Sequence, residues 1–204
     1  MLDPAWRVVP ERADIVVDGE RRGRAAWRTI LFHKPRGVVT THRDPEGRRT
    51  VFDVLGDEAR GLVAAGRLDL ATTGLLLLTT DSQLANWITD PANAVPRVYA
   101  VTVRGEVALA EAARLRAGVV CGRDRLAAAA VTLRKISRRE SHLVVELREG
   151  KNREVRRLLE AIGHEVTRLK RVRLGGLELN DLEPGEWREL SRAEIHAAFP
   201  KYPA

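Results

Sequence analysis

Apolar residues along this chain alternate or cluster in a way that predicts short strands separated by a few helices. Leu75 to Leu78 are four consecutive leucines, which is typical of a strand buried on both faces. Other segments are rich in β-branched residues or place apolar residues on one face with a period of two, and we expect strands there. These segments are TILFHKP, GVVTTH, RVYAVTVRG and HLVVELR.

The predicted helices are fewer, and capping residues mark their ends. The segment VALAEAARLRAG is amphipathic, and NREVRRLLEAIG has Asn152 in a position that suits an N-cap. Ser191 and Glu194 form a capping-box pattern before the last predicted helix. Because the strands come in adjacent runs and do not alternate strictly with helices, we expect an α+β fold with a mainly antiparallel mixed sheet flanked by helices.

The first 27 residues differ from the rest of the chain. They contain one short predicted strand, Ile15 to Val17, then a turn at Asp18-Gly19 and an arginine-rich stretch. We interpret residues 1–27 as an N-terminal arm, the remnant of a small domain, and residues 28–204 as the main domain.

The charge balance points to an anionic partner. The 204 residues include 35 Lys and Arg against 28 Asp and Glu, a formal net charge of +7. Nucleic acid is the commonest large anionic partner of such proteins, although an arginine excess also keeps a fold soluble. At 44% hydrophobic residues, the chain is long and apolar enough to build a substantial core.

Cysteine and histidine give no sign of a metal centre. Cys121 is the only cysteine, so neither an intrachain disulfide nor a cysteine-based zinc site is expected. The five histidines never occur at the spacing of a ligand pair, and no apolar run approaches the length of a membrane span. We therefore expect a cytoplasmic protein that needs no metal and does not enter a membrane.

The segment GRLDLATTGLLLLTTD places a carboxylate beside the most apolar part of the chain. Asp69 follows Gly66, precedes a predicted Thr72-Thr73-Gly74 turn and borders the leucine strand. A carboxylate held at the edge of a core can act as a nucleophile if a nearby cation keeps it ionised. An aspartate at the start of a turn is more commonly a local cap, and spacing alone leaves both interpretations open.

A basic segment from Lys151 to Arg173 could provide that cation. It contains eight basic residues against three acidic ones. On the predicted helix, Arg156 lies near the edge of the apolar stripe, where it can be partly buried and reach a carboxylate. The other arginines of the segment are expected to be more exposed and to bind phosphates, although such runs are commonly only a solvated surface.

Several motifs together resemble those of pseudouridine synthases, in the branch that modifies ribosomal RNA of both subunits. The signature Gly-Arg-Leu-Asp lies at residues 66 to 69, and the other similar segments follow in the order found in the family. They are HKPRGVVTTHRDPEGRRTVFDVL, PRVYAVTVRG, REGKNREVRRLLEAIGHEVTRLKRVRLGGLEL and LEPGEWREL. The resemblance runs from about Arg28 to Leu190 and favours the reactive interpretation of the aspartate.

The resemblance implies a role for individual residues. Asp69 corresponds to the catalytic aspartate, Tyr99 to the tyrosine that stacks on the target base, and Arg156 to the basic partner of the aspartate. Arg67 corresponds to the signature arginine that contacts RNA. Other basic residues are expected to bind RNA as well: Lys34, Lys151, Arg153, Arg157, Arg171 and Arg173. The family fold is a curved antiparallel sheet decorated with helices, and the family needs neither a metal nor an organic cofactor.

Two departures from the family pattern are visible, His33 in place of the usual Asn and Glu154 in place of the usual Gln. Residues 1–27 are too short for the N-terminal RNA-binding domain that most members of this branch have. The resemblance implies isomerisation of a uridine to pseudouridine in ribosomal RNA, more specifically that of the large subunit, by a monomeric enzyme. The alternatives are a non-catalytic ribosomal RNA-binding or assembly factor, and a nuclease or glycosidase, for which no paired carboxylates are evident.

Overall fold

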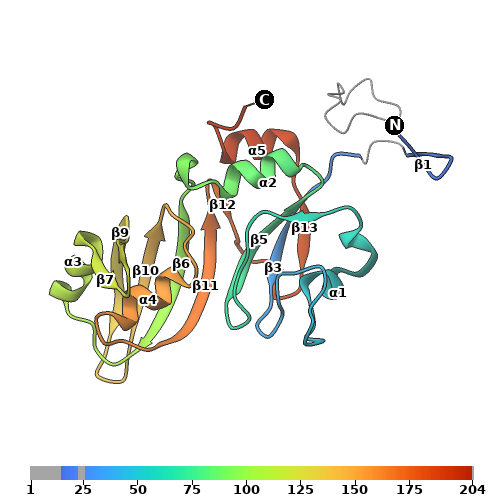
Figure 1. The fold of residues 1–204 in the computed structure, drawn as a ribbon. Coiled ribbons are helices and arrows are strands. Elements are labelled where there is room, and N and C mark those ends of the chain that lie inside the picture. Colours follow the sequence, from blue (N-terminus) through green and yellow to red (C-terminus); the bar gives the residue numbers. More distant parts are fainter. Residues whose placement is uncertain (1–14, 23–25, 204) are drawn as a thin grey trace.

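The computed structural model describes residues 15–22 and 26–203 and shows one long mixed sheet with helices on its faces (Figure 1). Its main strand order is β13-β3-β5-β11-β6-β10-β9, with β4 added beside β5 and β12 beside β11. All pairings are antiparallel except that of β5 with β11, which are parallel. The predicted α+β class with a mainly antiparallel sheet is therefore confirmed.

The central strands are β3 (Thr29–Lys34), β5 (Thr73–Thr79), β6 (Arg97–Arg104), β10 (Glu140–Leu147) and β11 (Val166–Leu174). The shorter or peripheral strands are β4 (Val63–Ala64), β7 (Val119–Cys121), β8 (Asp124–Leu126), β9 (Ala130–Ile136), β12 (Leu177–Glu178) and β13 (Trp187–Glu189). Strands β7 and β8 form a separate two-stranded sheet.

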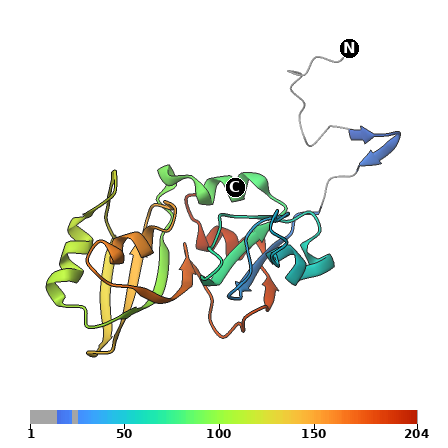
Figure 2. The ribbon, with the colours of Figure 1, turned by 60° about the horizontal axis from the view of Figure 1, so that its bottom comes forward.

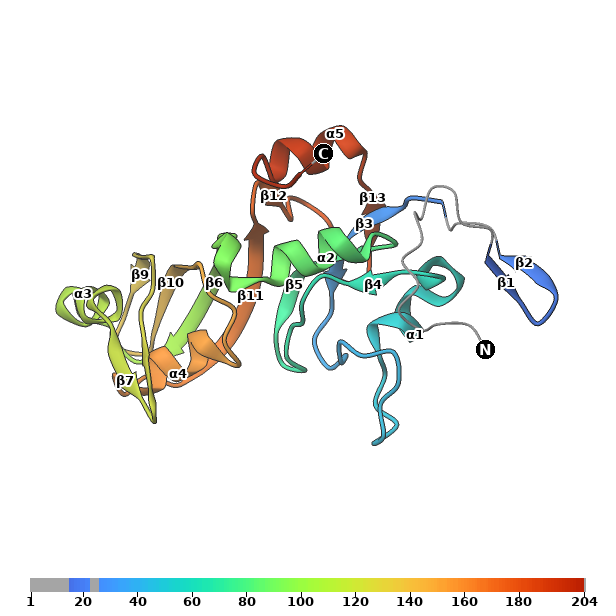
Figure 3. The same ribbon diagram turned by 45° about the horizontal axis from the view of Figure 1, so that its top comes forward.

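Helices cover both faces of the sheet. They are α1 (Val51–Leu55), α2 (Ser82–Thr89), α3 (Leu109–Ala117), α4 (Glu154–Glu160) and α5 (Arg192–Ala198), with 3-10 turns at η2 (Gly56–Ala59) and η3 (Pro91–Asn93). Figure 3 shows α2 and α5 beside the centre of the sheet, whereas α3 and α4 lie at the end that contains β9 and β10.

The sheet separates two apolar clusters. Leu76 and Leu78 of β5 face the larger one, which includes residues of β6, β10, α3 and α4. Leu75 and Leu77 face the smaller one, which is filled by α2 and α5. All four leucines are fully buried, which confirms the predicted strand buried on both faces.

The two halves of the sheet meet at the pairing of β5 with β11, which covers only two residue pairs, Thr73 with Lys170 and Gly74 with Arg171. The strands approach so closely that a Cβ on Gly74 would lie 2.2 Å from the carbonyl oxygen of Arg171. Gly74 also has a φ of 108°, which L side chains rarely adopt. We call this pairing the seam.

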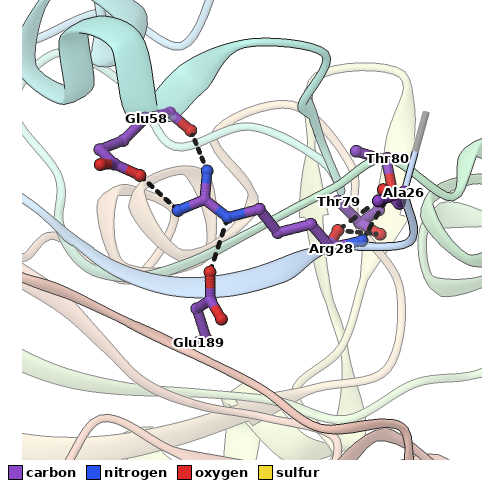
Figure 4. Close-up of polar contacts among 6 residues, drawn as sticks. All are labelled: Ala26, Arg28, Glu58, Thr79, Thr80 and Glu189. Atoms are coloured by element: carbon purple, nitrogen blue, oxygen red, sulfur yellow. Dashed lines mark hydrogen bonds and ion pairs between the residues drawn. The ribbon is translucent and has the colours of Figure 1, made fainter.

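The main domain begins at a tightly bonded arginine, Arg28. Its guanidinium pairs with Glu58 at 2.5 Å and Glu189 at 2.7 Å, and its backbone amide donates to Thr80 Oγ1 (Figure 4). It also lies over the ring of Trp187, with Cζ 5.1 Å from the ring centroid. These contacts join the start of β3 to η2 and β13, so the chain is anchored where it enters the sheet.

A two-stranded hairpin precedes this anchor. It consists of β1 (Ile15–Val17) and β2 (Glu20–Arg22), and it stands apart from the main sheet in Figure 2. The predicted strand and its turn at Asp18 are confirmed. The remainder of the predicted arm, residues 1–14 and 23–25, lies outside the described residues.

Some local predictions were wrong. The segment GVVTTH is a loop whose one pairing is an isolated bridge from Val39 to Thr50. The helix predicted in NREVRRLLEAIG has Arg153 as its N-cap residue, one position later than expected. Near the signature, the turn lies at residues 70–71, because Thr73 and Gly74 already belong to β5.

Candidate active site

A cavity of about 550 Å³ lies across the seam and is lined by several of the residues that the motifs single out, although Arg156 is not among them. One wall comes from the loop of residues 39–48 and from the Gly66 to Thr72 segment. The opposite wall comes from β6, β11 and the loop between β10 and α4. Asp69, Tyr99 and Arg153 all line it, although they come from three distant parts of the sequence.

The position of Asp69 depends on the segment that leads into β5. The backbone amide of Thr72 donates to the carbonyl oxygen of Asp69 at 3.0 Å, and Thr40 Oγ1 donates to that of Leu68 at 3.0 Å. Leu68 is buried in the larger apolar cluster. The carboxylate itself remains about one-third exposed, so it is held in place yet open to the cavity.

Two arginines of α4 lie near this carboxylate. Among the described residues, the ion pair of Asp69 is with Arg153, whose Nη1 lies 3.8 Å from Oδ2. Arg156 is buried, and its Nη1 donates to the carbonyl oxygen of Val166 at 3.1 Å. Burial lowers the pKa of Arg156, as does the charge of Arg153, while the charge of Asp69 raises it. Arg156 is therefore close enough to act on Asp69 electrostatically, and the direct contact belongs to Arg153.

Arg153 occupies an unusual backbone conformation. Its φ is 49° and its ψ is 31°, the left-handed region, and it forms the first turn of α4 without a side-chain cap. Non-glycine residues in this region are uncommon and concentrate at functional sites. The conformation directs an exposed cation toward Asp69.

Tyr99 lies at the bottom of the cavity. It is 9% exposed and pairs across the sheet with Arg171. Burial on β6 orients the ring while leaving it among the residues that line the cavity. A flat aromatic face in this position is suited to stacking against a base.

Two residues predicted to bind RNA, Lys34 and Arg171, are buried, and for Arg171 this corrects the expected exposure. Lys34 has no exposed surface, and its Nζ donates to the carbonyl oxygens of Thr72 at 2.8 Å and Pro35 at 3.0 Å. Burial lowers its pKa to about 8, partly offset by the charge of Asp69. Arg171 is 3% exposed, and its Nε donates across the seam to the carbonyl oxygen of Leu75 at 2.7 Å. Both cations support the chain around Asp69 from within the protein.

Other predicted residues lie on the surface in different settings. Arg67, Lys151 and Arg153 are exposed and line the cavity. Arg157 is half-buried and binds Asp124 at 2.6 Å, away from the cavity lining. Arg173 pairs with Glu146 at 3.4 Å and lines a second cavity together with Lys170. A register shift in β11 between Arg171 and Arg173 explains why these two arginines do not share a cavity.

The motifs did not single out three further basic residues that line the cavity. Arg43 and Arg48 come from the loop that follows the segment GVVTTH, and Arg97 begins β6. Arg48 binds Asp44 through two hydrogen bonds of 2.7 and 3.0 Å, which stiffens the loop. In all, seven basic and four acidic residues line the cavity, so its charge favours an anionic ligand. Arg97 had a sequence signal, since it lies two positions before Tyr99 on the same strand face.

Neither a metal cluster nor a membrane-spanning helix is found where the structure describes the chain. Within residues 15–22 and 26–203, no three His, Cys, Asp or Glu side chains are grouped to hold a metal ion. In the same residues, no helix is long and apolar enough to cross a membrane.

Comparisons with known proteins agree with this geometry. The family model for RNA pseudouridylate synthase matches residues 28–161. An Aquifex aeolicus protein described as an uncharacterized RNA pseudouridine synthase is 34% identical over 194 residues, covering 95% of this chain and 78% of that protein. The ribosomal large subunit pseudouridine synthase B of Escherichia coli K12 is 44% identical over 172 residues, covering 83% of this chain.

The alignment spans only 59% of the length of that Escherichia coli relative. Among solved structures, a pseudouridylate synthase crystal structure superposes with a TM-score of 0.73 at 29% identity, covering 83% of this chain and 73% of the other. A human protein, RNA pseudouridylate synthase domain containing 1, shares the fold with a TM-score of 0.52 at 15% identity. From the family match and these relatives, we conclude that the chain belongs to the RNA pseudouridine synthase family.

Proposed function

We propose that this protein isomerises uridine to pseudouridine in ribosomal RNA, with Asp69 as the reacting carboxylate. The observation on which the proposal rests is the meeting of Asp69, Tyr99 and Arg153 in one cavity. In this reaction the bond between uracil N1 and ribose C1′ breaks, the base turns, and a bond from C5 to C1′ forms. The hydrogen on C5 leaves as a proton and N1 takes up a proton, so the product is an isomer and the reaction needs no oxidant and no second substrate.

The target base has to leave its stack before the reaction begins. Unstacking costs a few kcal/mol unless the RNA is already open at that point. Tyr99 would offset this cost by stacking on the extruded base. The cavity is large enough for a nucleotide, and its basic lining is suited to the flanking phosphates.

We assign the basic residues to two tasks. Arg156, buried behind Asp69, keeps that carboxylate ionised during the reaction. Arg67, Lys151 and Arg153 are exposed in the cavity and contact phosphates. Lys34 and Arg171 support the active-site backbone and do not meet RNA directly.

The name of the relatives supports large-subunit ribosomal RNA as the source of the substrate. The proposal places the reaction in the cytoplasm, where bacterial ribosomes assemble. It also assigns the reaction to a single copy of the chain.

The test is Asp69→Asn, which keeps the shape of the side chain and removes its ionisable oxygen. We expect turnover, measured as release of tritium from C5 of uracil in ribosomal RNA, to fall by on the order of 10³-fold or more. RNA affinity and the unfolding free energy should stay close to those of the natural protein. A variant that kept substantial turnover would contradict the assignment, and a natural protein that bound this RNA without releasing tritium would favour the binding-factor alternative.

A further inference from the structure

Arg97 is a buried cation whose hydrogen bonds go to backbone carbonyl groups. It is 6% exposed at the start of β6. Its Nη1 donates to the carbonyl oxygens of Val95 and Glu149, and its Nη2 donates to that of Ile88, each at 2.9 Å. One side chain thus joins the end of α2, the approach to β6 and the loop that follows β10.

The charges around Arg97 do not compensate for the burial of its guanidinium group. Burial lowers its pKa, as does the charge of Arg171, and the raising effects of Tyr99 and Glu154 only partly offset this. Within the described residues, no carboxylate forms an ion pair with it, although a buried charge is costly unless it is well hydrogen-bonded. The three carbonyl groups are therefore its main ligands.

The bonded loop presents two of the seven basic residues that line the cavity, Lys151 and Arg153. We call residues 149–153 the basic loop. Gly150 lies against the guanidinium, since a Cβ added there would be 3.5 Å from Cζ of Arg97. At its other end, the amide of Lys151 donates to Oε2 of the buried Glu154 at 3.2 Å. The loop ends at Arg153, which reaches Asp69.

We propose that Arg97 is a positioning residue that fixes the basic loop to the strand of Tyr99. Because Arg97 and Tyr99 lie two residues apart on one face of β6, the stacking ring and the phosphate-binding cations keep a set distance from each other. The inference rests on the proposed function of the loop in RNA binding. Arginine suits the task because its planar group offers several donors in fixed directions, whereas lysine offers three from one nitrogen.

The first experiment measures RNA affinity against salt concentration for five variants, two of which are controls. Lys151→Met combined with Arg153→Met should flatten the slope of log affinity against log salt by about 1.4 for two lost contacts to single-stranded RNA. Arg97→Gln alone should flatten it by a similar amount, because the loop is released. The triple variant, which combines Arg97→Gln with Lys151→Met and Arg153→Met, should have the same slope as the double variant, because Arg97 acts only through the loop.

Arg67→Met is the matched control, because Arg67 lies on the opposite wall of the cavity. It should lower the slope by about 0.7 equally in the natural and the Arg97→Gln backgrounds. If the triple variant lost slope beyond the double variant, Arg97 would be an independent phosphate contact and the proposal would be overturned. A natural slope in Arg97→Gln would also overturn it.

The second experiment covers the case in which Arg97→Gln does not fold. Arg97→Lys keeps the charge and loses the fixed directions of the donors, so we expect the amides of Lys151 and Glu154 to exchange hydrogen at least about tenfold faster. The amide of Gly37, bonded to Leu70 in the other half of the sheet, is the control and should be unchanged. Unchanged exchange at the loop would contradict the proposal. This measurement involves no RNA, so its outcome is independent of whether Asp69 performs the reaction.

Discussion

The two halves of the sheet are buried differently, and they provide different parts of the site. In the half with β3 and β5, both faces are covered, and every residue of β3 is buried. In the half with β9 and β10, burial alternates: Leu143 and Leu147 are buried, whereas Val144 and Glu146 are partly exposed. A strand covered on both faces has less freedom to move than one covered on a single face.

Asp69 leads into the doubly covered half, and the α4 arginines and Tyr99 belong to the other half. The comparison indicates that the reacting group is placed by a core covered on both faces, while Tyr99, Lys151 and Arg153 come from a half with one open face. The seam keeps the two sets of residues in register across the cavity. Each prediction below tests part of this division.

The largest expected effect is that of Arg156→Met on the reaction rate, compared with that of Arg153→Met. Arg156→Met removes the buried cation behind Asp69, so single-turnover rates should fall by about 10²- to 10³-fold with an unchanged salt slope. Arg153→Met should lose less than about tenfold in rate and flatten the salt slope by roughly 0.7. The reverse pattern would make Arg153 the essential partner of Asp69, in agreement with its closer contact in the free protein.

The next effect concerns the seam itself. Gly74→Ala places a Cβ 2.2 Å from a backbone oxygen that cannot move freely, so we expect a loss of roughly 3 kcal/mol in unfolding free energy in urea. Gly105→Ala is the control, since its φ is 81° but the space around it is open, and it should lose about 1 kcal/mol. Similar losses for the two variants would mean that the strands separate readily at the seam.

Substitutions of Tyr99 test whether its ring stacks on the target base. Tyr99→Leu removes the aromatic face and should weaken binding of a uridine-containing RNA by about 1–3 kcal/mol. Tyr99→Phe retains the ring and should stay within about threefold of the natural affinity and rate. Equal losses in the two variants would assign the function of the residue to its hydroxyl group.

The pH dependence of the unfolding free energy tests how burial affects Lys34, which lies in the half covered on both faces. Its folded-state pKa of about 8 lies below the unfolded value of 10.5, so the folded protein releases this proton first. Stability should therefore rise with pH through 8 and up to about 10.5, by roughly 1 kcal/mol between pH 7 and pH 9. The difference in unfolding free energy between the natural protein and Lys34→Met isolates this term, and a flat difference curve would show that Lys34 titrates normally.

The smallest expected effect is at Arg173. This residue faces the second cavity and pairs with Glu146, so Arg173→Met should leave the RNA salt slope unchanged. A loss of about 0.7 in the slope would show that RNA contacts both faces of the open half.

Local signals in the sequence predicted most of the fold. The four leucines of β5, the alternation along β10 and the Ser191 capping box depend on neighbouring residues only, and all three are confirmed. The segment GVVTTH failed because β propensity requires a partner strand, and the structure offers it a single bridge at Val39.

The site was less predictable, since burial of its cations depends on long-range contacts. Arg171 alternates with apolar residues in the sequence, which predicts an exposed side chain. It is buried because it pairs with Gly74 at the seam, where the two halves of the sheet meet. Lys34 is buried because it ends a strand covered on both faces. The roles of Asp69, Tyr99 and Arg156 came from motif resemblance, and they remain predictions that the variants above address.

The left-handed backbone conformation of Arg153 makes stability and function favour different residues at this position. Glycine or asparagine adopts this conformation with less strain, so Arg153→Gly or Arg153→Asn should stabilise this turn or leave it unchanged. Either change removes the cation that faces Asp69. Selection for thermal stability alone would therefore tend to replace this arginine, whereas selection for RNA modification would retain it.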